Sequence, residues 1–197
     1  MPQTTRHLIA VLLPDRVGAL RDVTAAIVRM GGNITGIRQT IVDGFFSLVF
    51  TSTHPAEVTS DAIRNELAAR LEPDAAILVR AYTCRPSPTL AVGARYVAMT
   101  RGPDRAGTIH AISAFFVEHG SNIEDWQAED EGADVIYTAQ VTIPDTADFR
   151  KIQDAFRARM NARGLSATIC HENIFRATNE IGPIKGLLAS GKVNSKQ

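Results

Sequence analysis

The chain has 197 residues and a mass of 21.3 kDa, and its 21 Lys and Arg residues are balanced by 21 Asp and Glu residues. This length allows one ordinary domain or two small ones. A hydrophobic content of 45% and a charged content of 21% are close to the globular average, which argues against disorder and fibrous repeats. The balanced charge argues against binding by bulk electrostatics, so we expect no direct nucleic-acid partner and no membrane association.

Cysteine and histidine are sparse and lack the spacing of metal ligands. The two cysteines, Cys84 and Cys170, lie far apart, which is typical of free thiols in a reducing compartment. The apolar run Leu8–Leu13 is too short for a signal peptide or a membrane span. The chain also lacks a glycine-rich phosphate loop and a nucleophile–base arrangement. We therefore expect a cytoplasmic protein without metal, cofactor or catalytic activity.

The chain contains an internal repeat with an offset of 89 residues. Pro14-Asp15-Arg16-Val17-Gly18-Ala19-Leu20 reads like Pro103-Asp104-Arg105-Ala106-Gly107-Thr108-Ile109. Downstream, Gly31, Asn33 and Ile34 recur as Gly120, Asn122 and Ile123. Such long-period self-similarity indicates one structural unit used twice.

The first repeat predicts a strand, a helix, two strands, a helix and a final strand, in that order. Asp15 is expected to cap and open the first helix, whose core face is Leu20, Val23, Ile27 and Met30, and Gly31-Gly32 to end it. Asp43-Gly44 predicts the turn of a hairpin. The expected strands are Leu8–Leu13, Ile34–Ile41, Phe45–Thr51 and Ala75–Thr83, with the second helix marked by Ile63, Leu67 and Leu71.

The second repeat predicts the same order. Asp104 is expected to open its first helix and Gly120 to end it, and Glu131-Gly132 predicts the hairpin turn. The expected strands are Tyr96–Thr100, Ile123–Ala128, Asp134–Ile143 and Leu165–His171; the first helix is marked by Ile109, Ile112, Phe116 and His119, and the second by Phe149, Ile152, Phe156 and Met160.

The order βαββαβ, read twice, predicts an α+β protein made of two ferredoxin-like units, each an antiparallel sheet with both helices on one face. The units are expected to lie side by side or face to face. Arg85-Pro86-Ser87-Pro88 predicts a stiff linker. The expected boundaries are 1–84 for the first unit, 85–94 for the linker, 95–175 for the second unit, and 176–197 for an extension that either docks or frays.

The turn Asp-Arg-x-Gly before the first helix of each repeat has the most unusual composition. Unpaired amides at a helix start, together with the helix dipole, favour a bound anion such as a carboxylate. Glycine at position 18 or 107 lets a ligand approach the backbone. Asp15 with Asn33, and Asp104 with Asn122, supply acceptors for an ammonium group. This pairing suits a free α-amino acid, although a cap and a packing glycine also occur in turns that bind nothing.

The motif PDRVGALRDVTAAIVRMGGNI and its partner GPDRAGTIHAISAFFVEHGSNI resemble the signature of the ACT domain family. ACT domains are βαββαβ modules that bind amino acids and regulate metabolism. A free-standing pair of them resembles the glycine cleavage system transcriptional repressor family. The resemblance implies an amino-acid sensor whose ligands lie between paired ACT units and contact the first loop and the helix start. Carried over by position, the implied ligand-binding residues are Asp15, Arg16, Val17, Gly18, Ala19, Leu20, Asn33, Ile34, Asp104, Arg105, Ala106, Gly107, Thr108, Ile109, Asn122 and Ile123.

The resemblance also implies regulation through protein contact, because no helix-turn-helix or basic arm is visible. We expect a homodimer, since exposed sheet edges and faces need covering, and a regulatory protein as a further partner. Two alternatives remain. The chain is a constitutive interaction module with vestigial ligand sites, or, less favoured, a small acyl-phosphate hydrolase using Arg16 and Asn33.

The zero net charge conceals an uneven distribution. Residues 95–175 hold 8 basic and 12 acidic side chains, and residues 176–197 hold 4 and 1. Many of these acidic residues lie in the hairpin predicted for the second repeat. They are Glu124, Asp125, Glu129, Asp130, Glu131 and Asp134. Their spacing differs from that of a calcium loop, so we interpret them as a solvated surface or a docking patch for a basic partner.

Overall fold

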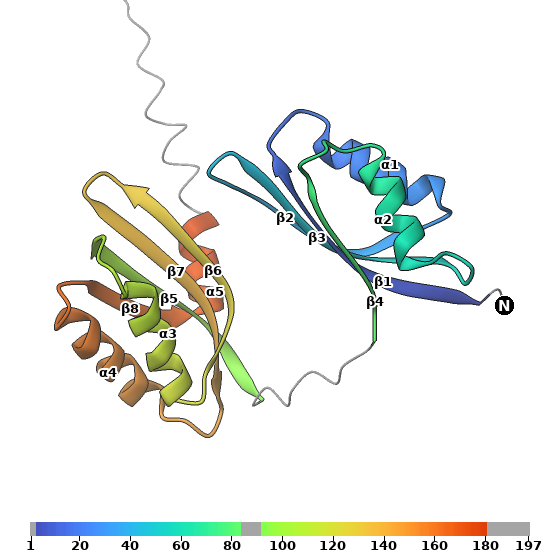
Figure 1. Ribbon diagram of the computed structural model, residues 1–197. Coiled ribbons are helices and arrows are strands. Elements are labelled where there is room, and N and C mark those ends of the chain that lie inside the picture. The colour runs from blue at the N-terminus through green and yellow to red at the C-terminus, as the bar shows by residue number, and fades with distance from the viewer. Residues whose placement is uncertain (1–2, 84–91, 181–197) are drawn as a thin grey trace, which may run out of the picture. The chain divides into compact units, whose positions relative to one another are not determined.

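The computed structural model describes residues 3–83 and 92–180, which fall into two compact units divided between Arg85 and Pro86 (Figure 1). The predicted linker motif 85–88 and Cys84 lie outside the described residues. The order of elements is βαββαβ in each unit, followed by one further helix. The α+β class, the duplicated unit and its element order are confirmed.

The first unit contains four strands and two helices. They are β1 (Thr4–Pro14), α1 (Ala19–Arg29), β2 (Asn33–Val42), β3 (Phe45–Pro55), α2 (Ser60–Ala68) and β4 (Ala76–Ala81). The strands form one antiparallel sheet in the order β2-β3-β1-β4. Leu71, expected on the second helix, follows its end and still packs into the core.

The second unit repeats this arrangement. Its elements are β5 (Gly93–Pro103), α3 (Thr108–Glu118), β6 (Asn122–Glu131), β7 (Asp134–Pro144), α4 (Phe149–Asn161) and β8 (Ser166–His171), followed by α5 (Glu172–Glu180). The sheet order is β6-β7-β5-β8, again antiparallel. Both edge strands carry a bulge at matching places, between Ile34 and Gly36 and between Ile123 and Asp125.

Buried and exposed side chains alternate along the strands, so each sheet has one face toward its helices and one face away from them. In β1, residues Ile9, Val11 and Leu13 are buried against α1 and α2, which contribute Ile27 and Leu67 to the same core (Figure 1). Because strand side chains alternate between faces, the intervening residues lie on the opposite face, which we call the open face. The second core is built in the same way, around Phe115, Phe116 and Phe156.

The helix ends confirm one prediction and correct another. Gly31 and Gly120 have φ of 66° and 63°, the left-handed conformation predicted for the end of the first helix. The amides of Gly32 and Ser121 donate to carbonyls five residues earlier, which completes a Schellman motif in both repeats. The N-caps are not Asp15 and Asp104, however, because α1 and α3 begin only after Gly18 and Gly107.

The second hairpin turn is also displaced by one residue from its prediction. Glu131 pairs with Asp134, so the two-residue turn is Gly132-Ala133, and Gly132 has φ of 70°. A glycine at the first of two turn positions satisfies a type II′ hairpin, which the Glu131-Gly132 interpretation overlooked. The first turn, Asp43-Gly44, is confirmed, with φ of 49° and 78° at its two residues.

The structure adds α5, which the sequence did not assign. It follows β8 directly and crosses the expected boundary between 175 and 176, while β5 begins two residues before the expected start at 95. α5 lies on the open face of the second sheet (Figure 1), where Val97 is 1% exposed. Within the described ranges, no helix is long and apolar enough to cross a membrane.

Candidate functional site

The loops before α1 and α3 differ from the other strand-to-helix connections in how their helices start. The N-caps Gly18 and Gly107 have φ of 91° and 82° and provide no side-chain hydrogen bond. By contrast, Thr59 and Asp148 accept bonds from the first-turn amides of α2 and α4. The first turns of α1 and α3 therefore keep amides without a side-chain acceptor, as an anion-binding helix start requires.

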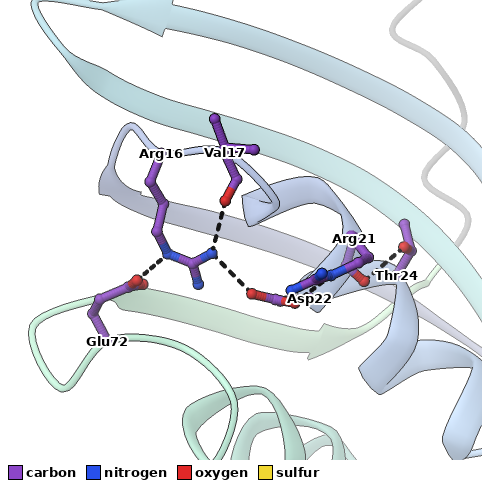
Figure 2. A network of polar contacts seen from close by, with 6 residues as sticks. All are labelled: Arg16, Val17, Arg21, Asp22, Thr24 and Glu72. Atoms are coloured by element: carbon purple, nitrogen blue, oxygen red, sulfur yellow. Dashed lines mark hydrogen bonds and ion pairs between the residues drawn. The ribbon is translucent and has the colours of Figure 1, made fainter.

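In the first loop, the guanidinium of Arg16 is held by two carboxylates (Figure 2). Its Nε donates to Glu72, in the connection between α2 and β4, and its Nη1 lies 2.9 Å from Oδ2 of Asp22 on α1. Asp22 also pairs with Arg21 at 2.8 Å. The positive charge of Arg16 is thus satisfied within the unit, and Arg16 ties the loop to the α2–β4 connection.

The ionisation of these groups reflects the same pairing. Hydrogen bonds from Arg21 and then Arg16 lower the pKa of Asp22, and the bond from Arg16 lowers the pKa of Glu72. The bond to Glu72, with that to Asp22, raises the pKa of Arg16. All three groups are therefore charged near neutral pH, and the carboxylates compete with any ligand carboxylate for Arg16.

In the second loop, Arg105 has different partners. Its Nη1 donates to the backbone carbonyl of Arg163 at 3.1 Å, so its charge is not neutralised by that contact. A Cβ on Gly107 would lie 3.9 Å from Nη2 of Arg163, which places a second guanidinium beside the helix start. Asp104 accepts a hydrogen bond of 3.0 Å from the hydroxyl of Tyr137, whose pKa is raised by burial and by this bond.

The repeat offset explains the difference between the loops. At the positions of Glu72 and Asp22 the second unit has Asn161 and Ala111, and at the position of Asp74 it has Arg163. The second loop has therefore lost both carboxylates that hold the arginine. Its second guanidinium comes from Arg163, whereas Arg21 of the first loop is replaced by His110. Two loops with one sequence motif have opposite electrostatic surroundings.

The structure does not bring the predicted asparagines to the loops of the same unit. Asn33 is paired with Thr53, which in turn pairs with Arg6 at the beginning of β1, whereas the loop follows the end of β1 at Pro14. Eight residues of strand separate them by roughly 26 Å, at about 3.3 Å per residue. Asn122 stands in the same relation to the second loop. The asparagine recurs at the same sequence position in both repeats, but this recurrence does not indicate how far the asparagine lies from the loop in space.

The remaining predicted residues divide into exposed and packed positions. Val17 is fully exposed, and Leu20 and Ile109 are also exposed, so they are available to a ligand or partner. Ala106 is exposed as well. Ala19 and Thr108 are buried at the helix starts, and Ile34 and Ile123 pack against the two cores at the far end of the sheets.

Three residues that contact these loops were not predicted from the sequence. Glu72, Tyr137 and Arg163 come from other elements and meet the loops only in the folded unit. For Glu72 and Arg163, the repeat offset supplied a usable signal, because the alignment of the halves shows which charges changed. For Tyr137, its counterpart Leu48 gave no indication of a polar role.

The two units have the sheet order and helix placement of the ferredoxin-like βαββαβ class. Residues 7–70 match the family model described as the ACT domain, so the first unit is an ACT domain. This confirms the resemblance read from the motif, and the second unit shares the same fold. No curated protein sequence matches the chain.

Two solved structures are similar to this chain over most of its length. An unknown protein from Galdieria sulphuraria is similar with a TM-score of 0.71 and 21% identity, over 86% of this chain and 99% of its own. A protein provisionally assigned as a glycine cleavage system transcriptional repressor is similar with a TM-score of 0.58 and 15% identity, over 85% and 96%. At these identities the likeness concerns the fold, and it spans both units.

Proposed function

We propose that this protein is a non-catalytic regulator that binds a free amino acid at the loop before α3. The α-carboxylate lies at the uncapped start of α3, beside Arg105 and Arg163, and Asp104 accepts from the ammonium group. What supports this most is the combination of an uncapped helix start with guanidiniums that no described carboxylate holds. Anions are favoured where amides, dipole and guanidinium coincide.

The proposal assigns different roles to the two loops. Arg16 is held by Glu72 and Asp22, so the first loop has a structural role and its ligand site is vestigial. The hydrolase alternative loses its support, because Arg16 is engaged and Asn33 lies at the other end of the sheet. The alternative of a constitutive interaction module remains, and a measurement of amino-acid binding distinguishes it from the proposed regulator.

Binding would act through protein contact. A bound amino acid favours one arrangement of a self-associated protein and so one surface for a regulatory partner in the cytoplasm. Glycine is the first ligand to try, because one of the similar structures is provisionally assigned to repression of the glycine cleavage system. The asparagines at the far sheet ends are available to a ligand only across paired units.

The test is thermal denaturation of the full chain with each of the twenty amino acids at millimolar concentration. A ligand at ten times its Kd stabilises a domain by about 1.4 kcal/mol, or several degrees. Arg105→Ala and Arg163→Ala should each weaken binding at least about tenfold, because each removes a charge-assisted contact. The matched variant Arg16→Ala should leave affinity unchanged.

Two outcomes would contradict the proposal. If none of the twenty amino acids shifts the transition, the interaction-module alternative is favoured. If Arg16→Ala abolishes binding while Arg105→Ala does not, the first loop is the site and the electrostatic argument is wrong.

A further inference from the structure

The open face of the first sheet carries arginines and no carboxylate. Its residues come from alternate positions of all four strands, and its charged members are Arg6, Arg38 and Arg80. Arg6 lies over the ring of Tyr82 and donates to Thr51. Within residues 3–83 and 92–180, neither Arg38 nor Arg80 forms an ion pair.

The centre of this face is apolar and uncovered by any described residue. Leu12 is 45%, Val49 is 44% and Leu78 is 56% exposed. Leu12 and Leu78 line a hollow of about 280 Å³ together with Ala10, Ser47 and Ala76. Contiguous exposed apolar surface of this kind on a folded domain marks an interaction site.

The open face of the second sheet has a hollow of the same size at the equivalent positions. It is lined by Met99, Ile136 and Thr168, which occupy the places of Ala10, Ser47 and Leu78 in the sheet register. α5 covers only the neighbouring part of this face, where Phe175 and Val97 line an adjoining groove. Among the residues that the structure describes, an apolar hollow is thus left open on both sheets.

The second open face is acidic where the first is basic. Along edge strand β6, Asp125, Gln127 and Glu129 point to this face, each opposite a β7 residue of the groove. Arg95 pairs with Glu124, and Arg101 pairs with Glu131 and Asp134. Those pairs leave Asp125 and Glu129 without an ion pair to any described residue, so the uncompensated charge of this face is negative.

From these observations we propose that the open face of the first sheet of one chain packs against the open face of the second sheet of a second copy. The two contacts are reciprocal, so the assembly is a two-fold dimer in which every basic face meets an acidic one. Apolar centres with complementary charged borders are the usual anatomy of a specific interface. The proposal rests on the self-association in the proposed function and adds the surfaces that carry it.

The experiment is sedimentation of the full chain over a concentration series. The wild type is expected to sediment as a dimer whose dissociation constant rises with ionic strength, because the borders are charged. Arg38→Glu with Arg80→Glu should weaken the dimer at least about 100-fold, since carboxylates would then face carboxylates in both contacts. Gln127→Lys with Glu129→Lys should weaken it similarly.

An equimolar mixture of the two doubly substituted chains is the decisive sample. Each chain alone has two repulsive contacts, whereas in the mixed dimer both contacts join opposite charges, so dimerisation should return. The matched control substitutions change the charge of residues on the same edge strands, β2 and β6, whose side chains point to the helix-covered face of the sheet. Asp130→Lys and Gln39→Glu should leave the dissociation constant unchanged, and circular dichroism checks folding.

Three results would overturn the proposal. A wild-type chain that is monomeric throughout means that the faces stay open or pair within one chain. A dimer that tolerates Arg38→Glu with Arg80→Glu uses another surface, although self-association then stands. Failure of the mixture to dimerise excludes the reciprocal arrangement. None of these outcomes bears on the thermal denaturation test with amino acids, so the two proposals can fail separately.

Discussion

At the scale of single residues, Gly32 shows how a side chain from elsewhere fixes the identity of a turn residue. Its φ is not positive, yet a Cβ there would lie 2.3 Å from Cε1 of His54 and 2.8 Å from Cγ2 of Ile27. His54 is 1% exposed and its Nε2 is 2.9 Å from the hydroxyl of Ser52, so the ring cannot move away freely. The second repeat has Ser121 at this place, opposite Ile143.

We therefore expect Gly32→Ala to lower the free energy of unfolding of the first unit by about 2 kcal/mol, as overpacking of a filled core does. In a His54→Ala background the same change should cost clearly less, because its nearest contact is gone. Gly36→Ala, whose Cβ would meet only the hydroxyl of the half-buried Thr51 at 3.3 Å, is the matched control. Urea denaturation measures all four variants, and equal costs in both backgrounds would contradict this account.

At the scale of elements, the four helices of the two repeats start in two ways. α2 and α4 follow Thr59 and Asp148, whose side chains satisfy first-turn amides, whereas α1 and α3 follow glycines that satisfy none. The sequence suggested caps at Asp15 and Asp104 because aspartate before an apolar periodic run is the usual signal. The extra turn of backbone up to Gly18 and Gly107 is set by the left-handed glycine.

The side-chain caps of α2 and α4 should contribute measurably to the free energy of unfolding. Oδ1 of Asp148 accepts from the amides of Arg150 and Lys151 at 3.1 and 3.3 Å, so Asp148→Ala is expected to cost about 1 kcal/mol. Asp154→Ala is the control on the same helix, because Asp154 is exposed and only faces Arg157 at 3.6 Å. Chemical denaturation should show a change at 148 and almost none at 154.

At the scale of the whole molecule, the duplicated units have diverged in charge and in their cores. The first core contains His7 and His54, with ring centroids 5.6 Å apart, where the second has Tyr96 and Ile143. Burial lowers the pKa of His7. Burial lowers that of His54 more than the Met30 carbonyl raises it, and a charge on His7 lowers it further.

This difference predicts an acid sensitivity of the first unit. Because both pKa values lie below the usual 6.5, the unfolded chain binds protons that the folded unit does not, and stability falls as pH drops below about 6.5. Asp22 and Glu72 do not interfere, since their pKa values lie below 3.8 and 4.5. Thermal melts between pH 7.5 and 5 should show a fall that His7→Phe reduces. An unchanged slope in that variant would contradict the prediction.

The sequence by itself determined the duplicated βαββαβ plan, because the 3.6-residue and two-residue periods of Val23, Ile27, Phe46 and Leu48 follow from local chain geometry. It also located the glycine turns, since Gly31, Gly44 and Gly120 need a left-handed backbone. Only the tertiary structure decided which side chains meet. It placed Glu72 on Arg16, set Arg163 beside Gly107 and moved Asn33 to the far end of its sheet, because contacts between distant segments depend on strand order and register.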